Sequence, residues 1–264
     1  MPTERITSLQ NPRIKLARAL QDKKAREREA RFLVDDLRDL QRALHLGYEV
    51  DYALFCPALA TGAELDLAQT LPQVYETSAE AQAKAAYREH PNGLIAVLRS
   101  HQPRGLDDLV AQQTPYMLVL VNLQKPGNIG ALLRSADAAG FGPVLLIDST
   151  LDIYNPNIIR ASTGAVFLDN LFALTSDQAL PYLTAHYHLL AGHLRAEQSL
   201  FEADLRPPLA LVLGAEDQGL PPRWANACRR IKIPMVGRIT DSLNVSVSGA
   251  IFMYEALRQR SNTS

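Results

Sequence analysis

Four runs of almost uninterrupted apolar residues in the second half of the chain constrain its fold more than any other feature. They cover residues 117–121, 144–147, 188–191 and 209–213. A strand with one wet face alternates apolar and polar residues, whereas a strand of a parallel sheet is covered on both faces and stays apolar throughout. Helical patterns intervene or follow at about 129–139, 176–185, 221–228 and 245–260. This alternation predicts a doubly wound α/β domain with a mostly parallel sheet, in which ligands bind beyond the carboxyl ends of the strands.

The first hundred residues predict a second, smaller α/β/α domain. Helical patterns cover about 11–28, 37–46 and 78–86, and short strand patterns cover 32–34, 50–55, 73–75 and 94–98. Residues 101–104 are polar and include Pro103, which is typical of a linker. The sequence therefore predicts a domain over residues 1–100, a linker over 101–114 and the larger domain over 115–264.

Composition limits the class of protein. The 264 residues hold 27 Lys and Arg against 28 Asp and Glu, and the net charge of −1 excludes a uniformly basic nucleic-acid coat. The only two cysteines, Cys56 and Cys228, lie far apart in the sequence, which excludes a disulfide scaffold and a Cys-rich zinc site. The apolar runs fall far short of the ~20 residues that cross a bilayer, and Met1 leads into no apolar export signal. We expect a cytoplasmic protein that does not bind a membrane.

Positive charge is concentrated near the N-terminus. Residues 1–31 hold nine basic and four acidic groups, a local balance of +5. Two interpretations are open, a solvated helix face or a surface that contacts nucleic-acid phosphates. The candidates for the second are Arg13, Lys15, Lys23, Lys24, Arg26 and Arg28.

Chemistry is expected just after Val121, where the first apolar run ends. Pro126 and Gly127 predict a turn there, and Asn128 either caps the following helix or faces a ligand. Arg134 lies nearly two helical turns further on, where a lone arginine is either a solvated charge or a ligand contact. This segment alone does not decide between structure and function.

Two further segments follow predicted strands in the same way. Residues 214–220 place a glycine on either side of Glu216, a pattern that either wraps a ligand or makes an ordinary strand-to-helix turn. The segment lacks the Lys-Ser or Lys-Thr of a P-loop and the G-x-G-x-x-G spacing of a dinucleotide fingerprint. A third segment follows Ile233, and in it Ser242 and Asn244 either cap the last helix or face a ligand.

Together the three segments resemble the SpoU, or TrmH-type, RNA ribose methyltransferases of the SPOUT superfamily. The motifs that carry the resemblance are Asn128-x-Gly130-x-x-x-Arg134, Gly214-x-Glu216-x-x-Gly219-Leu220, and Ile233-Pro234-Met235 leading to Ser242-Leu243-Asn244-Val245-Ser246. Arg160-Ala161-Ser162 with Gly164-Ala165-Val166-Phe167 is similar to the family's intermediate segment. Residues 6–15 and 32–34 resemble the substrate-binding domain of the rRNA-modifying members.

The resemblance implies a fold and partners that periodicity does not reach. It implies an L30e-like N-terminal domain, and a C-terminal SPOUT domain with a deep trefoil knot, a rare exception to ordinary chain topology. It also implies a homodimer packed through the C-terminal domain. Residues 249–252 and Leu257 offer an apolar helix face for such a dimer, although packing within one chain explains that face equally well.

The activity that the resemblance implies is methyl transfer from S-adenosylmethionine to a ribose 2′-hydroxyl of RNA, in 23S-type rRNA. The cofactor residues that it implies are Leu213, Gly214, Ile233, Met235 and Leu243. The residues that it implies for the chemistry are Asn128, Arg134, Glu216, Ser242 and Asn244. A guanidinium is a poor proton acceptor near neutral pH, and we therefore expect Arg134 to clamp phosphate rather than to act as a base.

Some positions depart from the family pattern, and some alternatives stay open. Lys125 stands where an acidic residue is common, Asp217 where glycine is usual, and Asp35-Asp36 where a Glu-Gly pair is expected. The alternatives are a tRNA ribose methyltransferase and a non-catalytic RNA-binding protein on the same fold. A metal site could be drawn from the histidines at 186, 188 and 193, but their spacing matches no metal motif, and we expect no metal.

Overall fold

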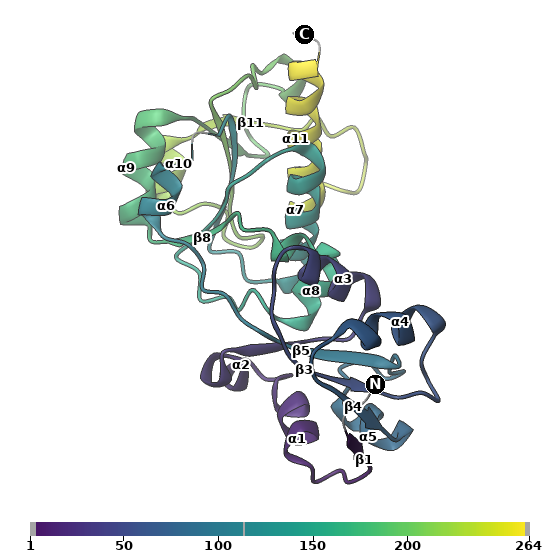
Figure 1. Ribbon diagram of the computed structural model, residues 1–264. Helices are drawn as coiled ribbons and strands as arrows, with labels where there is room; N and C mark the ends of the chain where they lie inside the picture. The colour runs from purple at the N-terminus through teal and green to yellow at the C-terminus, as the bar shows by residue number, and fades with distance from the viewer. Residues whose placement is uncertain (1–3, 113, 262–264) are drawn as a thin grey trace. The chain divides into compact units, whose positions relative to one another are not determined.

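The computed structural model describes residues 4–112 and 114–261 (Figure 1). They form two compact units. Unit 1 comprises the described residues up to Gln102 together with Asp152–Leu168, and unit 2 comprises Pro103–Leu151 and the described residues from Asp169 onward. In the described part of the chain, no helix is long and apolar enough to cross a membrane.

Unit 1 is built on a five-stranded mixed sheet. Its strands are β1 (Glu4–Ile6), β2 (Arg31–Val34), β3 (Val50–Phe55), β4 (Val74–Thr77) and β5 (Leu94–Arg99), in the order β1-β4-β3-β5-β2. Strand β5 is antiparallel to both of its neighbours, and the other pairs are parallel. The helices in the N-terminal part of the unit are α3 (Leu37–His45), α4 (Gly62–Thr70), α5 (Ala79–Ala85) and two others near the N-terminus. The sequence analysis did not predict β1 or α4.

The basic stretch forms two helices and not the single helix that its pattern predicts. Helix α1 (Pro12–Ala19) and helix α2 (Lys23–Glu29) are separated by a turn. The Asp22 side chain accepts the Lys24 backbone N–H at 2.8 Å, so Asp22 caps the start of α2. Ala30 ends α2 in the left-handed conformation. This break decides which of the basic side chains reach the surface.

Unit 1 includes a segment from the second half of the sequence, Asp152–Leu168. This segment holds α8 (Pro156–Ser162) and the 3-10 turn η1 (Ala165–Phe167). The Tyr154 ring stacks on Phe32 of β2 with centroids 4.2 Å apart, and Phe167 stacks on the same ring at 5.8 Å. Arg26 forms a buried ion pair with Asp152, with Nε and Oδ2 2.6 Å apart. The core of unit 1 is therefore completed by residues more than a hundred positions away.

Asp39 is a buried carboxyl group on α3. Burial raises its pKa to about 6, and the nearby Asp36 carboxylate adds to the rise, whereas Arg38, Arg42 and Arg88 oppose it. Among the described residues, its Oδ1 atom has no hydrogen-bond partner. The folded protein therefore holds a proton on Asp39 more tightly than the unfolded chain does.

We expect Asp39→Asn to raise the free energy of unfolding at pH 8 by about 1–3 kcal/mol and to have little effect near pH 3.5. Wild-type stability should fall as pH rises from the ordinary carboxyl value of 3.8 through about 6, because the unfolded chain releases this proton first. Urea unfolding across this range measures the effect. Asp66→Asn, at an exposed position of α4, is the control. Parallel pH curves for Asp39→Asn and the wild type would contradict the assignment.

Unit 2 confirms the predicted parallel sheet. Its strands are β6 (Tyr116–Val121), β7 (Val144–Ile147), β8 (Leu171–Leu174), β9 (His188–Gly192), β10 (Leu209–Leu213) and β11 (Arg229–Ile231). They are ordered β11-β9-β10-β6-β7-β8, and every pair is parallel. The sequence analysis located four of these strands but missed β8, and it placed the end of β11 at Ile233, two residues too late.

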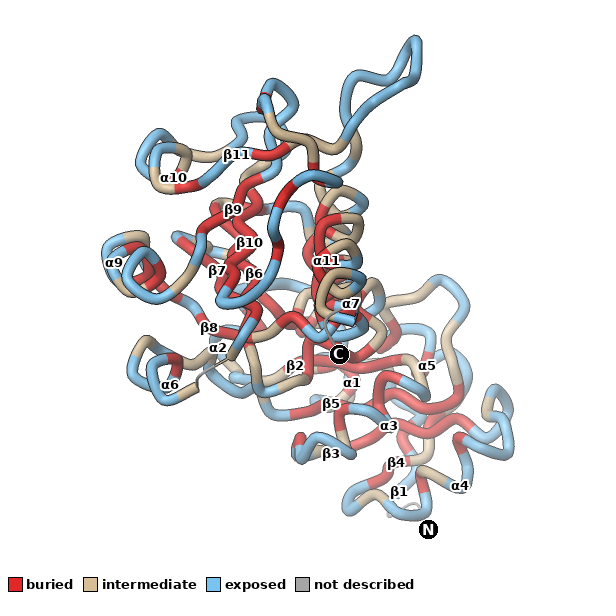
Figure 2. The backbone as a smooth tube through the Cα atoms, turned by 90° about the horizontal axis from the view of Figure 1, so that it is seen from above, coloured by how far each residue is buried: buried red, intermediate tan, exposed pale blue. Residues whose placement is uncertain are grey.

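Helices cover both faces of this sheet, which explains the uninterrupted apolar runs. Helices α9 (Ser176–His186) and α10 (Pro222–Ala227) lie on one side, and α7 (Pro126–Ala139) and α11 (Val245–Ser261) lie on the other (Figure 2). Met117, Val119 and Val121 of β6 belong to the core under α9, where Trp224 of α10 is also buried. The four helices agree with the predicted ones to within a few residues.

The segment expected as a linker takes part in the fold of unit 2. Helix α6 (Leu106–Val110) lies within residues 101–114, and its Leu109 is fully buried in the core beneath the sheet. Arg104 also pairs with Phe172 of β8 through a parallel bridge. The polar residues around Pro103 concealed this helix. It has only about one and a half turns and two leucines, which is too short to show a clear helical periodicity.

Candidate active site

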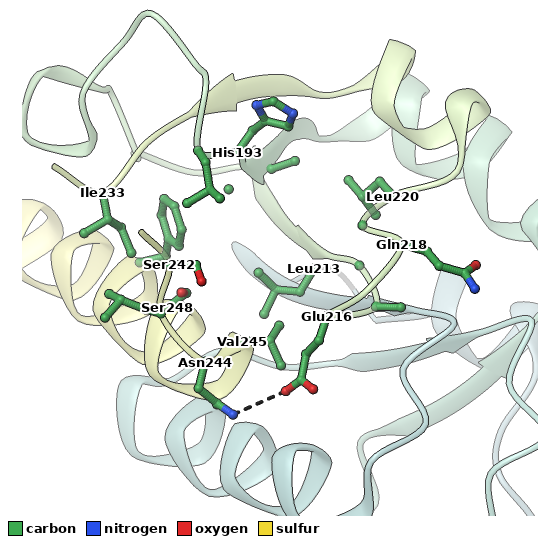
Figure 3. Close-up of a pocket in the computed structure, with 18 of the residues that line it drawn as sticks. His193, Leu213, Glu216, Gln218, Leu220, Ile233, Ser242, Asn244, Val245 and Ser248 are labelled. Atoms are coloured by element: carbon green, nitrogen blue, oxygen red, sulfur yellow. Dashed lines mark hydrogen bonds between the residues drawn. The ribbon is translucent and has the colours of Figure 1, made fainter. Parts of the chain in front are cut away.

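A cavity of about 840 Å³ opens in unit 2 at the carboxyl ends of β9 and β10 (Figure 3). The order of the sheet reverses next to β6, since β7 and β8 extend to one side and β10, β9 and β11 to the other. Such a reversal leaves a crevice beyond the strand ends in which α/β proteins bind ligands. Each of the three segments singled out in the sequence contributes lining residues to this cavity.

The loop after β10 owes its shape to its two glycines. Gly219 has a φ of +67°, and its N–H donates to the Ala215 carbonyl at 2.8 Å, which closes a tight turn. A Cβ on Gly214 would lie 2.5 Å from the backbone carbon and oxygen of Gly219. Gly214 is therefore required by the loop's own backbone. Asp217 does not adopt the left-handed conformation, and the departure at this position costs the turn nothing.

Four polar side chains from three separate segments meet at one side of the cavity. Glu216 accepts hydrogen bonds from Asn128 and Lys125, and the Lys125 contact is an ion pair. The Asn244 amide nitrogen lies 3.3 Å from Glu216 Oε1 (Figure 3) and 3.0 Å from Asn128 Oδ1. We call Lys125, Asn128, Glu216 and Asn244 the Glu216 cluster. It joins the starts of α7 and α11 to the loop after β10.

The structure shows whether Asn128 and Asn244 cap a helix, belong to the Glu216 cluster, or do both. Lys125, not Asn128, is the N-cap residue of α7, and Pro126 occupies the first helical position. The Asn128 side chain therefore belongs to the Glu216 cluster and does not cap the helix. Asn244 does both, because its Oδ1 accepts the Ser246 N–H at 2.8 Å while its amide nitrogen reaches Glu216.

The opposite part of the cavity is largely apolar. Its lining includes all five residues expected to bind the cofactor, which are Leu213, Gly214, Ile233, Met235 and Leu243. Ser242 also lines the cavity, and its hydroxyl lies 3.2 Å from Asp241 Oδ1 rather than in the Glu216 cluster. A pocket of this size, with apolar walls and a few convergent polar groups, is typical of small-ligand sites.

Arg134 is the one expected catalytic residue that does not line the cavity. It is exposed on α7, and within the described residues it makes no hydrogen bond or ion pair. The cavity also has walls that the sequence analysis missed. Gly192 at the end of β9 and the three residues after it line the cavity, and Phe252 of α11 packs so closely on Gly192 that a Cβ there would lie 2.7 Å from the ring. The sequence signal for this wall was Gly192 and the polar residues after it, which follow the strand predicted at 188–191.

The six basic candidates of the N-terminal stretch are divided by the structure. Arg26 is only 5% exposed and is paired with Asp152, so it is not available to RNA. On α2, Lys23 pairs with Glu27 at 3.5 Å and Arg28 with Glu29 at 2.8 Å, whereas Lys24 is exposed. The two candidates on α1 are Arg13, which stacks over the Tyr75 ring, and the exposed Lys15.

Lys15 lies in an open depression in the surface of unit 1. Arg18 of α1 and Lys84 of α5 also line it, as does Asp22, whose carboxylate caps α2. Lys15, Arg18 and Lys84 are exposed, and none of them forms an ion pair with a described residue. We call these three residues the basic groove. The sequence analysis missed Arg18 and Lys84 because two helices distant in sequence bring them together.

Neither metal ligands nor reactive thiols are assembled in the described part of the chain. No group of three or more His, Cys, Asp or Glu side chains there is placed to hold a metal ion. His193 lines the cavity, but its Nδ1 accepts the Arg195 N–H at 3.1 Å. Burial raises the pKa of the Cys228 thiol to about 12, which keeps it protonated at neutral pH.

Comparison with known proteins adds two matches to family models. Residues 115–254 match the SpoU rRNA Methylase family, and residues 11–96 match the MRM3-like substrate binding domain. The first match spans unit 2 from its first strand into its last helix. The second covers most of the N-terminal part of unit 1.

Individual relatives agree with these matches. The chain is 32% identical to an uncharacterized tRNA/rRNA methyltransferase of Synechocystis sp., over 97% of this chain and 94% of the relative. It is 37% identical to the 23S rRNA (guanosine-2′-O-)-methyltransferase RlmB of Photorhabdus laumondii, over 64% of this chain and 72% of the relative.

Solved structures resemble the whole chain. A crystal structure of an RNA 2′-O ribose methyltransferase is 39% identical, covers 97% of this chain and 99% of its own, and superposes with a TM-score of 0.84. An AdoMet-bound rRNA methyltransferase from Sinorhizobium meliloti is 27% identical, covers 97% of each chain and has a TM-score of 0.83. The match of residues 115–254 to the family model, together with these relatives, shows that the chain belongs to the SpoU rRNA methylase family.

Proposed function

We propose that this protein transfers a methyl group from S-adenosylmethionine to a ribose 2′-hydroxyl of ribosomal RNA, of the 23S type. The observation that carries the proposal is the Glu216 cluster, which faces an apolar pocket at the carboxyl ends of β9 and β10. Relatives named as 23S rRNA ribose methyltransferases, and the match of residues 11–96 to a substrate-binding domain, support the choice of RNA.

The pocket fits S-adenosylmethionine in size and chemistry. Leu213, Ile233, Met235 and Leu243 provide apolar walls for the adenine and the methionine chain, and the turn closed by the Gly219–Ala215 hydrogen bond lines the pocket beside them. When bound, the cofactor supplies the methyl group as an electrophile on a sulfonium. The nearby Glu216 carboxylate favours a positively charged ligand at this side of the cavity.

The residues of this chain orient the reactants. Asn128 and Asn244 fix the Glu216 carboxylate between α7 and α11, and this rigid acceptor positions the ribose hydroxyls against the cofactor. Ser242 lines the same pocket and offers a hydroxyl on its other side. Arg134 clamps a phosphate of the target nucleotide, a role that suits an exposed guanidinium that has no hydrogen-bond or ion-pair partner among the described residues.

The methyl-transfer experiment uses S-adenosylmethionine labelled in its methyl group and ribosomal RNA fragments. We expect label in RNA, and none at the modified nucleotide when its 2′-hydroxyl is replaced by hydrogen. Arg134→Ala should lower the single-turnover rate by about 10²-fold or more, and Arg134→Lys should retain part of it, because lysine keeps the charge but not the fork. Label that persists in the 2′-deoxy fragment, or unchanged rates in both variants, would overturn this part of the proposal.

The basic groove docks the RNA backbone on unit 1. Its three cations, which form no ion pair with a described residue, can contact phosphates, whereas Lys23 and Arg28 of α2 are paired within their own helix. Lys24 remains available to extend this contact. The groove reads charge and not base identity, because lysine and arginine contacts to phosphate carry no sequence information.

We expect charge reversal at Lys15, Arg18 and Lys84 to weaken RNA binding at least ~10-fold in low salt and to make its salt dependence shallower. Reversal at Lys23, Lys24 and Arg28 is the matched comparison and should have a smaller effect, because two of these side chains already have carboxylate partners. Filter binding across salt concentrations measures both. A larger effect from the second set would place the RNA on α2.

Assembly and topology complete the proposal. The protein is a homodimer through unit 2, with Val247 and Tyr254 exposed on α11 to take part, while Gly249 and Phe252 face the interior of the same chain. A trefoil knot forms where the chain after β11 passes to α11, and the packing of α11 against α7 is consistent with this path.

The cytoplasm is the expected site, where ribosomal RNA is modified. A tRNA ribose substrate is the alternative, and methylation of tRNA but not rRNA would favour it.

A further inference from the structure

Lys125 is the member of the Glu216 cluster that neither the motifs nor the proposed chemistry explains. It precedes α7 as its N-cap residue, yet its side chain caps nothing and instead pairs with Glu216. The Lys125 backbone carbonyl accepts the Asn128 and Ile129 N–H groups, but a cationic side chain at a helix N-terminus is unfavourable to the helix dipole, so the side chain does not serve the helix. Its partner lies 91 residues away, in the loop after β10.

The two ends of this ion pair differ in exposure. The Lys125 side chain is 73% exposed, whereas the Glu216 side chain is 22% exposed. Both residues line the cavity, and the more exposed ammonium can reach a second anion, while the carboxylate is more shielded from solvent. An ion pair with one exposed partner contributes about 0–1 kcal/mol, so an incoming anion can replace it at little cost.

Glu216 does not depend on Lys125 for its position. Its Oε1 accepts hydrogen bonds from Asn128 and Asn244, whereas Lys125 contacts the other oxygen, Oε2. Loss of the lysine contact therefore frees one carboxylate oxygen and leaves the carboxylate anchored through the other. Glu216 lines the cavity that we assign to the cofactor and the target ribose, so a freed oxygen would be available to a ligand there.

We infer that Lys125 is a positioning residue that exchanges partners when RNA binds: its ammonium leaves Glu216 for a backbone phosphate, and Glu216 Oε2 becomes free to accept a hydrogen bond from the ribose. This inference rests on the proposed function. A lysine suits the role because it acts as a flexible point charge and not as a fixed fork. The exchange ties the availability of the carboxylate to the arrival of RNA at the same cavity.

The test compares Lys125→Met, which keeps the length but not the charge, with Lys125→Arg, which keeps the charge. We expect Lys125→Met to raise the KM for RNA about 5- to 10-fold, to reduce the salt slope of RNA binding by about one phosphate contact, and to lower kcat less than KM rises. Calorimetry should give a Kd for S-adenosylmethionine within about threefold of wild type. Lys125→Arg should restore most of the KM and the salt slope.

Arg223→Met provides the matched control. Arg223 of α10 is an exposed cation paired with Asp177, and it does not line the cavity. The inference is overturned if Lys125→Met keeps the wild-type salt slope, or if it loses cofactor binding, since the lysine would then only support the pocket. A wild-type protein that binds RNA but methylates no ribose would instead contradict the proposed function, and the inference would fail with it.

Discussion

Gly214→Ala should weaken S-adenosylmethionine binding at least ~30-fold, about 2 kcal/mol, while the protein stays folded. The added Cβ would lie 2.5 Å from the Gly219 backbone and 2.7 Å from the Leu220 nitrogen. Backbone atoms cannot move aside as a flexible side chain does, and the hydrogen bond from Gly219 to Ala215 holds them in place. The turn must open, which displaces Glu216 and the cofactor wall together. Calorimetry with the cofactor alone measures the loss.

The control for this prediction is Gly237→Ala, in the exposed segment between β11 and α11. A Cβ there meets nothing closer than the Thr240 carbonyl at 3.8 Å, an ordinary contact. We expect cofactor affinity within about twofold of wild type for this variant. Gly214→Ala with wild-type affinity would mean that the turn adapts, and that its closed shape does not form the pocket.

Asp152→Ala should destabilise unit 1 by about 3–5 kcal/mol, because it leaves the Arg26 guanidinium buried without its carboxylate. The two side chains are 4% and 10% exposed, and Arg26 also donates to the Leu20 carbonyl at 2.6 Å. Hydrogen exchange at β2 and β5 measures the effect in the intact chain. The single tryptophan, Trp224, is buried in unit 2 and reports separately on that unit.

Two further variants separate a buried charge from a general loss of contacts. The double variant Arg26→Met with Asp152→Leu should recover most of the stability, because it leaves no unpaired charge. Glu29→Ala, which removes the partner of the exposed Arg28, should cost under about 1 kcal/mol. An Asp152→Ala variant as stable as Glu29→Ala would show that the pair is not essential to unit 1.

Local sequence patterns predicted most of unit 2, because they report burial directly. A strand covered on both faces must be apolar along its whole length, and this signal located β6, β7, β9 and β10. It missed β8, although Leu171–Leu174 is an apolar run as long as that of β7, and it was weak for β11, which begins with two exposed arginines at an edge of the sheet. The predicted end of β11 was two residues too late for a different reason, because Ile233 continues the apolar alternation of Ile231 beyond the end of the strand.

The three segments that contribute to the cavity were recognised because glycine, turn and cap residues follow strand ends in a recognisable order. The roles of those residues were harder to predict from the sequence. Asn128 had an equally good interpretation as a helix cap, and only the position of Glu216, 88 residues away, shows that its side chain turns into the cavity. Lys125 gave no signal beyond its departure from the family pattern, because its role depends entirely on that same distant carboxylate.

The sequence by itself determined the fold class, the family and three of the segments that line the cavity, because strand burial, turn chemistry and motif spacing depend on a few neighbouring residues. Only the tertiary structure decided which charges pair. Arg26 belongs to a basic run, yet it is buried against Asp152, 126 residues away. Asp152–Leu168 lies far along the sequence from the rest of unit 1, so local patterns do not show that it completes that unit. Charge along a sequence gives composition, whereas pairing and desolvation depend on contacts that only the folded chain creates.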